Sequence, residues 1–330
     1  MPAAIENSPG HDDPSDLAVV IVSWNVRDLL AACLASVFRS LAGSGLDAEV
    51  WVVDNASHDG SAEMVRRQFP QVRFIASEHN LGFAGGNNRV LRAMGFLDAE
   101  TPALPRYVLL LNPDTEVRGD ALAAMVAFMD RTPAAGVSGA RLVYGDGSFQ
   151  HSAFAFPGLR QIALDFFPLH WRLIESRLNG RYPRRLYQGS VPFEIDHPLG
   201  AAMLLRREVI LQTGPFDEGY HMYVEEIDWC MRIRRAGWSI YGVPSAEVVH
   251  HAGQSTRQVR DEMFVVLWRS RFRLFGKHYS RAFRWAARWL VRLGLWAEAR
   301  RAQAAYRRGE LGPEALRGWL AALEQVKREL

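Results

Sequence analysis

The sequence predicts an α/β fold in which helices cover both faces of a mainly parallel sheet. Four apolar runs, typical of strands that are buried on both sides, occur in the first 112 residues. Segments with helical spacing separate these runs. Strands that alternate with helices form right-handed βαβ units and therefore a parallel sheet.

The predicted elements follow one another from Leu17 onward. The four strands are the runs 17–23, 48–54, 72–76 and 106–112. The helices between them are expected at 26–41, from Ser57 or Asp59 to Phe69, and roughly at 87–96. Beyond Arg131 the pattern predicts a strand with a Gly-Asp-Gly turn, a strand at 200–207, a helix at 223–237, and short strands at 238–244 and 246–251.

Composition divides the chain into three expected parts. Residues 1–16 are polar, acidic and contain proline, so we expect a disordered N-terminus and no signal peptide. Residues 17–260 are expected to form the α/β domain. Residues 261–330 are expected to form a basic amphipathic helical region.

The small net charge of +3 conceals an asymmetry. Residues 255–330 contain 17 Lys and Arg against 7 Asp and Glu, a balance of +10, so the rest of the chain holds 22 against 29, a balance of −7. A basic tail on an acidic body indicates an anionic partner, either a membrane surface or nucleic acid. The two cysteines form no disulfide framework, which fits a reducing compartment.

Polar side chains end three of the four N-terminal strands. They are Ser23 and Asn25, Asp54 and Asn55, and Asn112 and Asp114. Ligands bind at the carboxyl ends of the strands in such sheets, so these residues predict one site. A nicotinamide-dependent enzyme would need a glycine-rich turn after the first strand, and the turn SWNVRD contains no glycine.

Three later motifs also carry polar groups, and each has a structural alternative. NLGFAGGNN (80–88) lets backbone approach a ligand beside a helix N-terminus. YVEEIDWCMR (223–232) places Glu225 and Asp228 on one helical face, although acids in a first helical turn are also stabilised by the helix dipole. VVHHAGQST contains His250 and His251 at a strand end, where a lone histidine is usually structural.

Taken in order, seven motifs resemble those of the family 2 glycosyltransferases, and most closely the rhamnosyltransferase-like branch that acts on bacterial surface polysaccharides. They are VVIVSWN, VVDNASHDGS, NLGFAGGNN, LLLNPDTEV, GAAMLLRR, FDEGYHMYVEEIDWCMRIRRAGW and VVHHAGQST. The resemblance covers about residues 17–280 and implies a GT-A fold, with a mixed, mainly parallel sheet and a C-terminal helical extension. It implies an inverting transferase that moves a sugar, possibly rhamnose, from a dTDP- or UDP-sugar to a glycan or lipid-linked acceptor.

The resemblance also implies roles for individual residues. Asp114 would hold Mg²⁺ or Mn²⁺ against the diphosphate, with His250 as a second ligand. Glu226 takes the position of the base that deprotonates the acceptor, with Asp228 and Glu225 beside it. The nucleotide-sugar pocket would comprise Ser23, Asn25, Asp54, Asn55, Asn80, Gly82, Asn87 and Asn112, and the acceptor would lie on Gly200 and Ala201.

The sequence departs from the family pattern at three of these places. Asn112 stands where an acid often stands, Glu226 where aspartate is common, and Ala252 where the pattern has glycine. Asp54 would accept a hydrogen bond from N3–H of a pyrimidine base. His251 receives no role.

Residues 264–299 interleave tryptophans with arginines and contain no apolar run long enough to cross a membrane. The tryptophans are Trp268, Trp285, Trp289 and Trp296. Such a helix suits the headgroup region of an anionic membrane, and packing against the catalytic domain is the alternative. No nucleic-acid-binding module is recognisable. We therefore expect a cytoplasmic enzyme, peripheral on the inner face of the plasma membrane, with an inactive nucleotide-sugar-binding scaffold as the alternative function.

Overall fold

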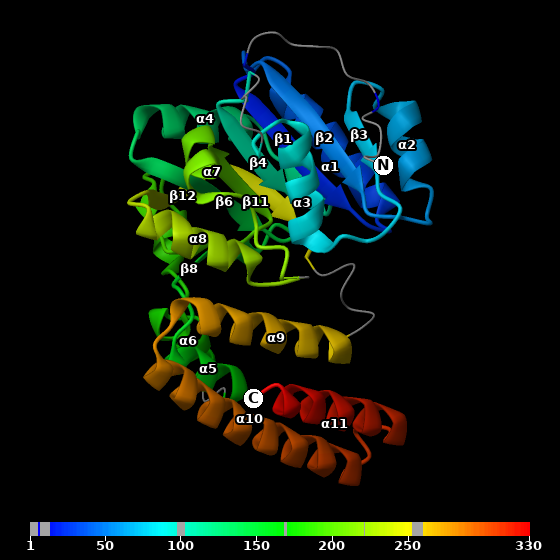
Figure 1. Cartoon of the computed structure of the whole chain (residues 1–330), viewed down its shortest axis with the longest axis vertical. Coiled ribbons are helices and arrows are strands. Elements are labelled where there is room, and N and C mark those ends of the chain that lie inside the picture. The colour runs from blue at the N-terminus through cyan, green and yellow to red at the C-terminus, as the bar shows by residue number, and fades with distance from the viewer. Residues whose placement is uncertain (1–5, 7–13, 98–102, 168–169, 221, 253–259) are drawn as a thin grey trace. The chain divides into compact units, whose positions relative to one another are not determined.

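The computed structural model describes residue 6 and residues 14–97, 103–167, 170–220, 222–252 and 260–330. Two compact units make up the chain (Figure 1). The first, here called the sheet unit, comprises residues 1–154, 184–221 and 225–255. The second, the helical unit, comprises residues 155–183, 222–224 and 256–330.

The sheet unit is built on one mixed sheet with the strand order β3-β2-β1-β4-β11-β6-β12-β5. Its strands are β1 (Leu17–Ser23), β2 (Ala48–Asp54), β3 (Arg73–Ala76), β4 (Tyr107–Leu111), β5 (Thr115–Val117), β6 (Ala135–Val143), β11 (Ala202–Arg206) and β12 (Ser239–His250). Short strands β7 (Phe149–Gln150) and β9 (Phe193–Glu194) pair beside this path, and β8 (Ala153–Phe154) pairs with β10 (His197–Pro198). Only β11 and β5 in the main path run against the others, so the sheet is mainly parallel.

Helices cover both faces of this sheet, as the alternating pattern predicted. They are α1 (Arg27–Leu41), α2 (Ser61–Gln68), α3 (Gly82–Ala93), α4 (Ala121–Arg131), α7 (Arg207–Thr213) and α8 (Glu225–Arg235). Leu17, Val19 and Ile21 join a core cluster with apolar residues of α1, α2 and α4. Because successive side chains of a strand alternate, Val22 points to the opposite face, where it contacts α3.

The third helix begins five residues earlier than the sequence predicted. Most of the glycine-rich motif lies inside α3 and not in a loop before it. A Cβ atom on Gly86 would come within 2.6 Å of Cγ1 of Val22, so glycine is needed here for close packing of helix on strand. Tertiary packing therefore overrides the low helix propensity of glycine in this motif.

The two short strands predicted between residues 238 and 251 are one strand, β12. Its pairing with β6 shifts register between Val243 and Glu247. Pro244 lies in this interval and has no backbone N–H for the ladder, which accounts for the irregularity. The strand then continues to His250.

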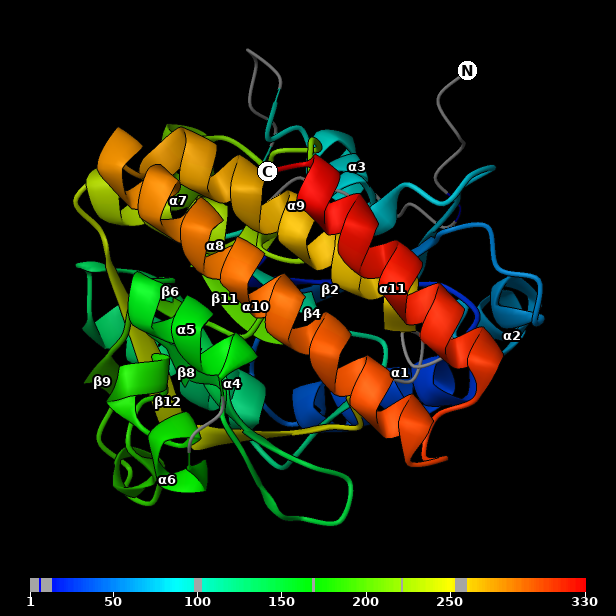
Figure 2. The same cartoon turned by 90° about the horizontal axis from the view of Figure 1, so that it is seen from below.

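The basic tail forms three helices where the sequence predicted one amphipathic region. They are α9 (Arg260–His278), α10 (Arg281–Arg307) and α11 (Pro313–Arg328), with α5 (Leu159–Phe166) and α6 (Trp171–Ile174) in the same unit. α10 lies beside α11, and both contact α9 (Figures 1 and 2). The ring of Phe166 stacks on that of Trp268 at 5.1 Å, and Gly294 leaves room for Phe166 against α10.

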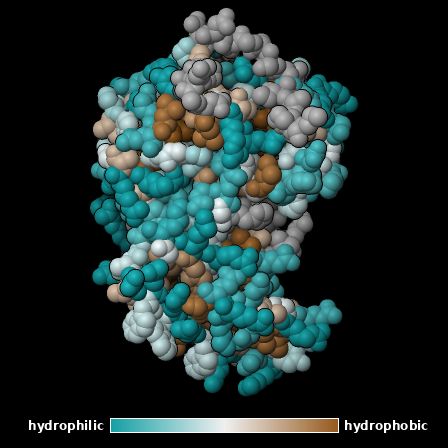
Figure 3. Space-filling model, viewed as in Figure 1, coloured by the Kyte–Doolittle hydropathy of each residue, from teal (hydrophilic) through white to brown (hydrophobic). Residues whose placement is uncertain are grey.

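Residues 155–183 therefore pack with the tail, although the sequence predicted them to be part of the α/β domain. A short 3₁₀ segment, Arg177–Asn179, belongs to these residues, and a second, Arg184–Tyr187, follows them in the sheet unit. No helix among the described residues is long and apolar enough to span a membrane. The face in Figure 3 is mostly hydrophilic, with small separate groups of hydrophobic residues.

Of the N-terminus, residues 1–5 and 7–13 lie outside the described residues, and so does most of the predicted disordered segment. Glu6 forms an isolated β-bridge with Phe74 and an ion pair with Arg66. Asp16 pairs with Arg106 just before β1 begins.

Candidate active site

Two buried polar atoms lie at the carboxyl ends of the neighbouring strands β1 and β2. Ser23 and Asp54 are partners in the β1–β2 register and are 0% and 4% exposed. Oδ2 of Asp54 accepts a hydrogen bond from the backbone N–H of Ser57 at 3.0 Å. Neither Oδ1 of Asp54 nor Oγ of Ser23 has a partner among the described residues. Buried polar atoms are generally paired, so this pair is suited to a ligand with hydrogen-bond donors.

Hydrogen bonds join the loops that follow β1 and β2. The backbone N–H of Asn25 donates to Oγ of Ser57 at 3.0 Å, and that of His58 donates to Oδ1 of Asn25 at 2.8 Å. The backbone N–H of Arg27 donates to Oδ2 of Asp59 at 2.8 Å. Asn25 itself has a left-handed backbone with φ 52°, a conformation that asparagine tolerates better than most residues. Asn25 therefore shapes the wall beside Asp54.

The asparagines predicted around the nucleotide bond to backbone at the start of α3. Nδ2 of Asn55 donates to the carbonyl of Gly82 at 3.1 Å, and the N–H of Gly82 donates to Oδ1 of Asn80 at 2.9 Å. Nδ2 of Asn87 donates to the carbonyl of Phe83 at 2.9 Å. These side chains fix the turn that leads into α3.

Asp114 and His250 meet where β12 pairs with β5. Oδ1 of Asp114 lies 3.5 Å from Nε2 of His250, and both side chains are largely buried. The described residues contain no group of three or more His, Cys, Asp or Glu that could hold a metal ion. A carboxylate and an imidazole suit a divalent cation such as Mn²⁺, with remaining oxygen ligands from a bound diphosphate. The donor set thus fits a metal shared with the donor substrate.

Gln150, which the sequence did not indicate as a site residue, lies directly behind His250. Its Nε2 is 3.1 Å from Nδ1 of His250, and its buried Oε1 has no partner among the described residues. Rotating the side-chain amide of Gln150 by 180° would let Nδ1–H of His250 donate to Oε1 of Gln150. The lone pair on Nε2 of His250 would then be available to a cation. Such a partner commonly sets the tautomer of a metal-binding histidine. No sequence signal pointed to Gln150, because only the β6–β7 pairing brings it here.

Asn112 and Thr115 hold the acidic turn in shape. The backbone N–H of Asn112 donates to the carbonyl of Ala201 at 2.9 Å, and Oγ1 of Thr115 donates to the carbonyl of Asn112 at 2.7 Å. Sγ of Cys33 lies 3.6 Å from the same carbonyl, and burial raises the pKa of this thiol to about 12. Cys33 is therefore a neutral packing group beneath the turn.

Three acids of α8 have three different surroundings. Asp228 is fully buried, and its carboxylate accepts hydrogen bonds from Nε of Arg232 at 3.0 Å and from the hydroxyl of Tyr220 at 3.3 Å. Glu225 is 4% exposed, and its Oε2 has no partner among the described residues. Burial, and secondarily the charge of Glu226, raise the pKa of Glu225 well above its ordinary value.

Glu226 lies against the predicted acceptor segment. A Cβ atom on Gly200 would be 3.7 Å from both Cβ and Cγ of Glu226. Ala201, the next residue, bonds through its carbonyl to Asn112 of the acidic turn. The structure thus connects the predicted base, the predicted acceptor residues and the acidic turn.

The backbone immediately before α8 is strained. Tyr223 has φ 68° and Val224 has φ 75°. A β-branched residue in the left-handed region is a conformational outlier, and such strain is concentrated at functional sites. It directly precedes the two glutamates.

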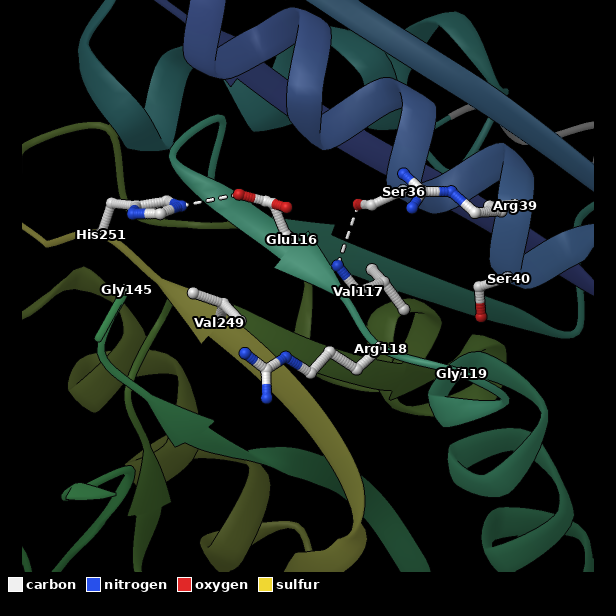
Figure 4. A pocket seen from close by; sticks show the side chains of 10 residues that line it. All are labelled: Ser36, Arg39, Ser40, Glu116, Val117, Arg118, Gly119, Gly145, Val249 and His251. Carbon is white, nitrogen blue, oxygen red and sulfur yellow. Dashed lines mark hydrogen bonds and ion pairs between the residues drawn. The ribbon is translucent and has the colours of Figure 1, made fainter. Parts of the chain in front are cut away.

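A separate cavity of about 550 Å³ opens beside β5 and β12 (Figure 4). Its lining residues are Ser36, Arg39, Ser40, Glu116, Val117, Arg118, Gly119, Gly145, Val249 and His251, and none of them is a predicted site residue. Nε2 of His251 lies 2.8 Å from Oε1 of Glu116. His251 therefore lines this cavity, whereas its neighbour His250 lies beside Gln150 and Asp114.

Comparison with known proteins places this geometry in context. Residues 18–213 match the family model described as glycosyl transferase family 2. The chain is 30% identical over 284 residues to the N-acetylglucosaminyl-diphospho-decaprenol L-rhamnosyltransferase of Mycobacterium tuberculosis (strain CDC 1551 / Oshkosh), covering 84% of this chain and 89% of the relative. It is 26% identical over 194 residues to rhamnosyltransferase WbbL of Escherichia coli (strain K12), covering 58% of this chain and 70% of the relative.

Among solved structures, the chain resembles the mannosyltransferase PcManGT from Pyrobaculum calidifontis in complex with GDP-Man and Mn²⁺. The TM-score is 0.55 at 16% identity, covering 98% of this chain and 88% of that one. At this identity the likeness concerns the fold alone. It confirms the predicted GT-A architecture with its mixed, mainly parallel sheet and additional C-terminal helices.

Proposed function

The chain belongs to glycosyl transferase family 2 and is a glycosyltransferase, and we propose that it transfers a deoxyhexose from a nucleotide donor to a lipid-linked glycan with inversion. The observation that carries this proposal is that three carboxylates with different surroundings lie near the strand ends of one sheet. Asp54 ends β2, Asp114 follows β4, and Glu226 lies on Gly200 beside β11. Each has surroundings suited to a different task.

The end of β2 would bind the base of the donor. Oδ1 of Asp54 and Oγ of Ser23 need hydrogen-bond partners, and a pyrimidine supplies N3–H for the carboxylate. This chemistry supports a dTDP- or UDP-sugar. The resemblance to rhamnosyltransferases supports dTDP-rhamnose as the first donor to test.

Asp114 and His250 would hold a divalent cation, Mg²⁺ or Mn²⁺, which neutralises the diphosphate leaving group when bound. Gln150 would orient the imidazole. The solved structure of a fold relative with GDP-Man and Mn²⁺ supports a divalent metal for this fold.

Glu226 would take the proton of the acceptor hydroxyl as that oxygen attacks C1 of the sugar. Attack from the side opposite the diphosphate inverts the anomeric configuration. Burial, and secondarily the charge of Glu226, raise the pKa of Glu225 and so disfavour its charged form, which supports Glu226 as the base. Asp228 is occupied by Arg232 and positions the helix.

The acceptor would be a sugar diphosphate on a polyprenol, in the synthesis of a cell-surface polysaccharide. The M. tuberculosis relative, named for N-acetylglucosaminyl-diphospho-decaprenol, supports this class. A lipid-linked acceptor and the basic tail together support a position on the inner face of the plasma membrane.

A transfer assay tests the proposal. The full chain is incubated with Mn²⁺, a short-chain N-acetylglucosaminyl-diphospho-prenol and either dTDP-rhamnose, a UDP-sugar or GDP-mannose, and products are resolved by mass spectrometry. We expect transfer from the dTDP donor, and little from the GDP donor. Donor binding without any transfer would favour the inactive scaffold instead.

A further inference from the structure

The outer face of α10 is apolar where a solvent-facing helix should be polar. Trp285, Trp289, Leu293 and Trp296 are 66%, 54%, 53% and 56% exposed. Their spacing places them on one side of the helix over about 16 Å of its length. We call these four residues the tryptophan face.

The same helix packs into its unit through different residues. Ala287, Val291, Gly294, Leu295 and Ala302 are buried. Trp268 of α9, which the sequence pattern grouped with the other three tryptophans, is 2% exposed and belongs to the core. Packing within the helical unit thus accounts for Trp268 and leaves the tryptophan face without a role.

Arginines surround the tryptophan face. α10 contains seven arginines and one acid, Glu298, which lies on the opposite side and pairs with Arg301. Arg288 and Arg292 are exposed between the tryptophans. The guanidinium of Arg292 lies 5.5 Å from the ring centre of Trp289, and that of Arg300 lies 4.7 Å from that of Trp296.

We propose that the tryptophan face of α10 lies in the headgroup region of an anionic membrane. Tryptophan and arginine both favour this region, where a ring can bury its apolar body and a cation can meet lipid phosphate. This choice rests on the proposed function and deepens it, by naming the surface through which the enzyme would reach a lipid-linked acceptor.

The positive charge of α10 argues against a second copy of the chain as the partner that covers the tryptophan face. A symmetric dimer through this face would bring two rows of arginines together without an intervening acid from α10. Like charges at an interface destabilise it, whereas an anionic bilayer complements them. Scattered exposed apolar residues need no explanation, but three aligned tryptophans framed by cations do.

Vesicle cosedimentation of the full chain tests the proposal. Phosphatidylglycerol–phosphatidylethanolamine vesicles at low salt are compared with phosphatidylcholine vesicles. We expect binding to the anionic vesicles only, and at least about tenfold weaker binding for W285S/W289S/W296S and for R288E/R292E. The control R317E/R328E makes the same change in net charge at exposed positions of α11 and should retain binding.

Lipids brominated on the acyl chain add a direct readout. They should quench the tryptophan fluorescence of the wild type, and W285S/W289S/W296S should lose the quenched component. Equal loss of binding in R317E/R328E would mean diffuse attraction and overturn the proposal. So would a wild type that ignores anionic vesicles, or a wild-type dimer that only the tryptophan variant disrupts.

The membrane proposal and the proposed function can be contradicted separately. Transfer to a short-chain acceptor in detergent needs no bilayer, so the α10 variants should keep it. Vesicle binding without any transfer would contradict the enzyme assignment and leave the membrane surface standing.

Discussion

Five carboxylates of the candidate active site differ in what surrounds them, and these surroundings support different proposed roles. Asp54 has a buried oxygen without a partner among the described residues, and so does Glu225. Asp114 lies beside His250, Glu226 packs beside Gly200, and Asp228 is paired with Arg232. Sequence alone places three of these acids within four residues. Only their environments in the fold distinguish the acids proposed to bind, to accept a proton or to support the helix.

The first prediction concerns the metal. Asp114→Asn keeps the shape of the side chain but removes the charge proposed to hold a hard cation. We expect affinity for dTDP in the presence of Mn²⁺ to fall at least about tenfold, with unchanged weak binding in its absence. Isothermal calorimetry measures both. Equal Mn²⁺-dependent affinity in variant and wild type would remove Asp114 from the metal site.

A second prediction separates chemistry from binding. Glu226→Gln removes the proton acceptor and should lower kcat by ~10²–10⁴ while donor affinity stays unchanged. Glu225→Gln is the matched control: burial disfavours the charged form of Glu225, and an amide resembles its neutral form, so kcat should stay close to wild type. A larger loss of kcat in Glu225→Gln than in Glu226→Gln would transfer the role of base to Glu225.

The pH dependence of stability should reveal Glu225. Its pKa in the folded chain is raised above the ordinary value of 4.5 by burial, so the native state holds a proton that the unfolded state has released. Above pH 4.5 this group therefore lowers stability as pH rises, by up to about 1.4 kcal/mol per pH unit, until its folded pKa is passed. Denaturation midpoints of wild type and Glu225→Gln across this window should diverge, with the variant less sensitive to pH. Parallel curves would show that Glu225 titrates normally.

At the scale of elements, α3 shows how packing overrides local preference. Its glycines let the helix approach β1, and Asn88 ties the same helix to the backbone of Phe216 through two hydrogen bonds of 2.9 and 3.0 Å. Propensity alone predicted that the helix begins after the glycines, because glycine disfavours helix. The extension places Gly82, a predicted donor-binding residue, at the first position of the helix.

The corresponding prediction compares two glycines in helices. Gly86→Ala adds a methyl group 2.6 Å from Cγ1 of Val22 and should destabilise the sheet unit by about 1–3 kcal/mol. Gly276→Ala in α9 meets no atom within 4 Å, so the gain in helix propensity should leave stability equal or slightly raised. Urea denaturation followed by circular dichroism compares the midpoints. Similar shifts of the denaturation midpoint in the two variants would contradict the packing argument.

At the scale of the whole molecule, each of the two units is made of several separate segments of the chain. The sequence predicted that the catalytic domain ends at residue 260, but residues 155–183 pack with α9 to α11. Phe166 and Ile162 of α5 are only 3% and 1% exposed. Their burial depends on residues far along the chain, such as Trp268.

Truncation after Glu262 should therefore produce an aggregating chain. It removes α10, α11 and nearly all of α9, and it exposes the apolar side of α5. Soluble monomers rarely tolerate such an exposed apolar patch. Size-exclusion chromatography with light scattering should detect the aggregates. Ile162→Ser and Phe166→Ser in the truncated chain should reduce aggregation, whereas a monomeric truncated chain without them would refute the interpretation.

The sequence by itself determined the class of fold and the order of the motifs. Continuous apolar runs, such as Tyr107–Leu111, are typical of strands buried on both sides, and their alternation with helices indicates a parallel sheet. Because such sheets bind ligands at their carboxyl ends, Asp54 at the end of one run and Asp114 three residues after Leu111 predicted a site there, and the family resemblance supplied their expected roles.

Only the tertiary structure decided what depends on distant contacts. It brought Gln150 to His250, paired Asp228 with Arg232 and buried Glu225. It also divided the four tryptophans of residues 264–299 into one core residue and three exposed ones. Protonation states and exposure follow from burial and from partners across the fold, and the spacing of residues along the chain carries no record of either.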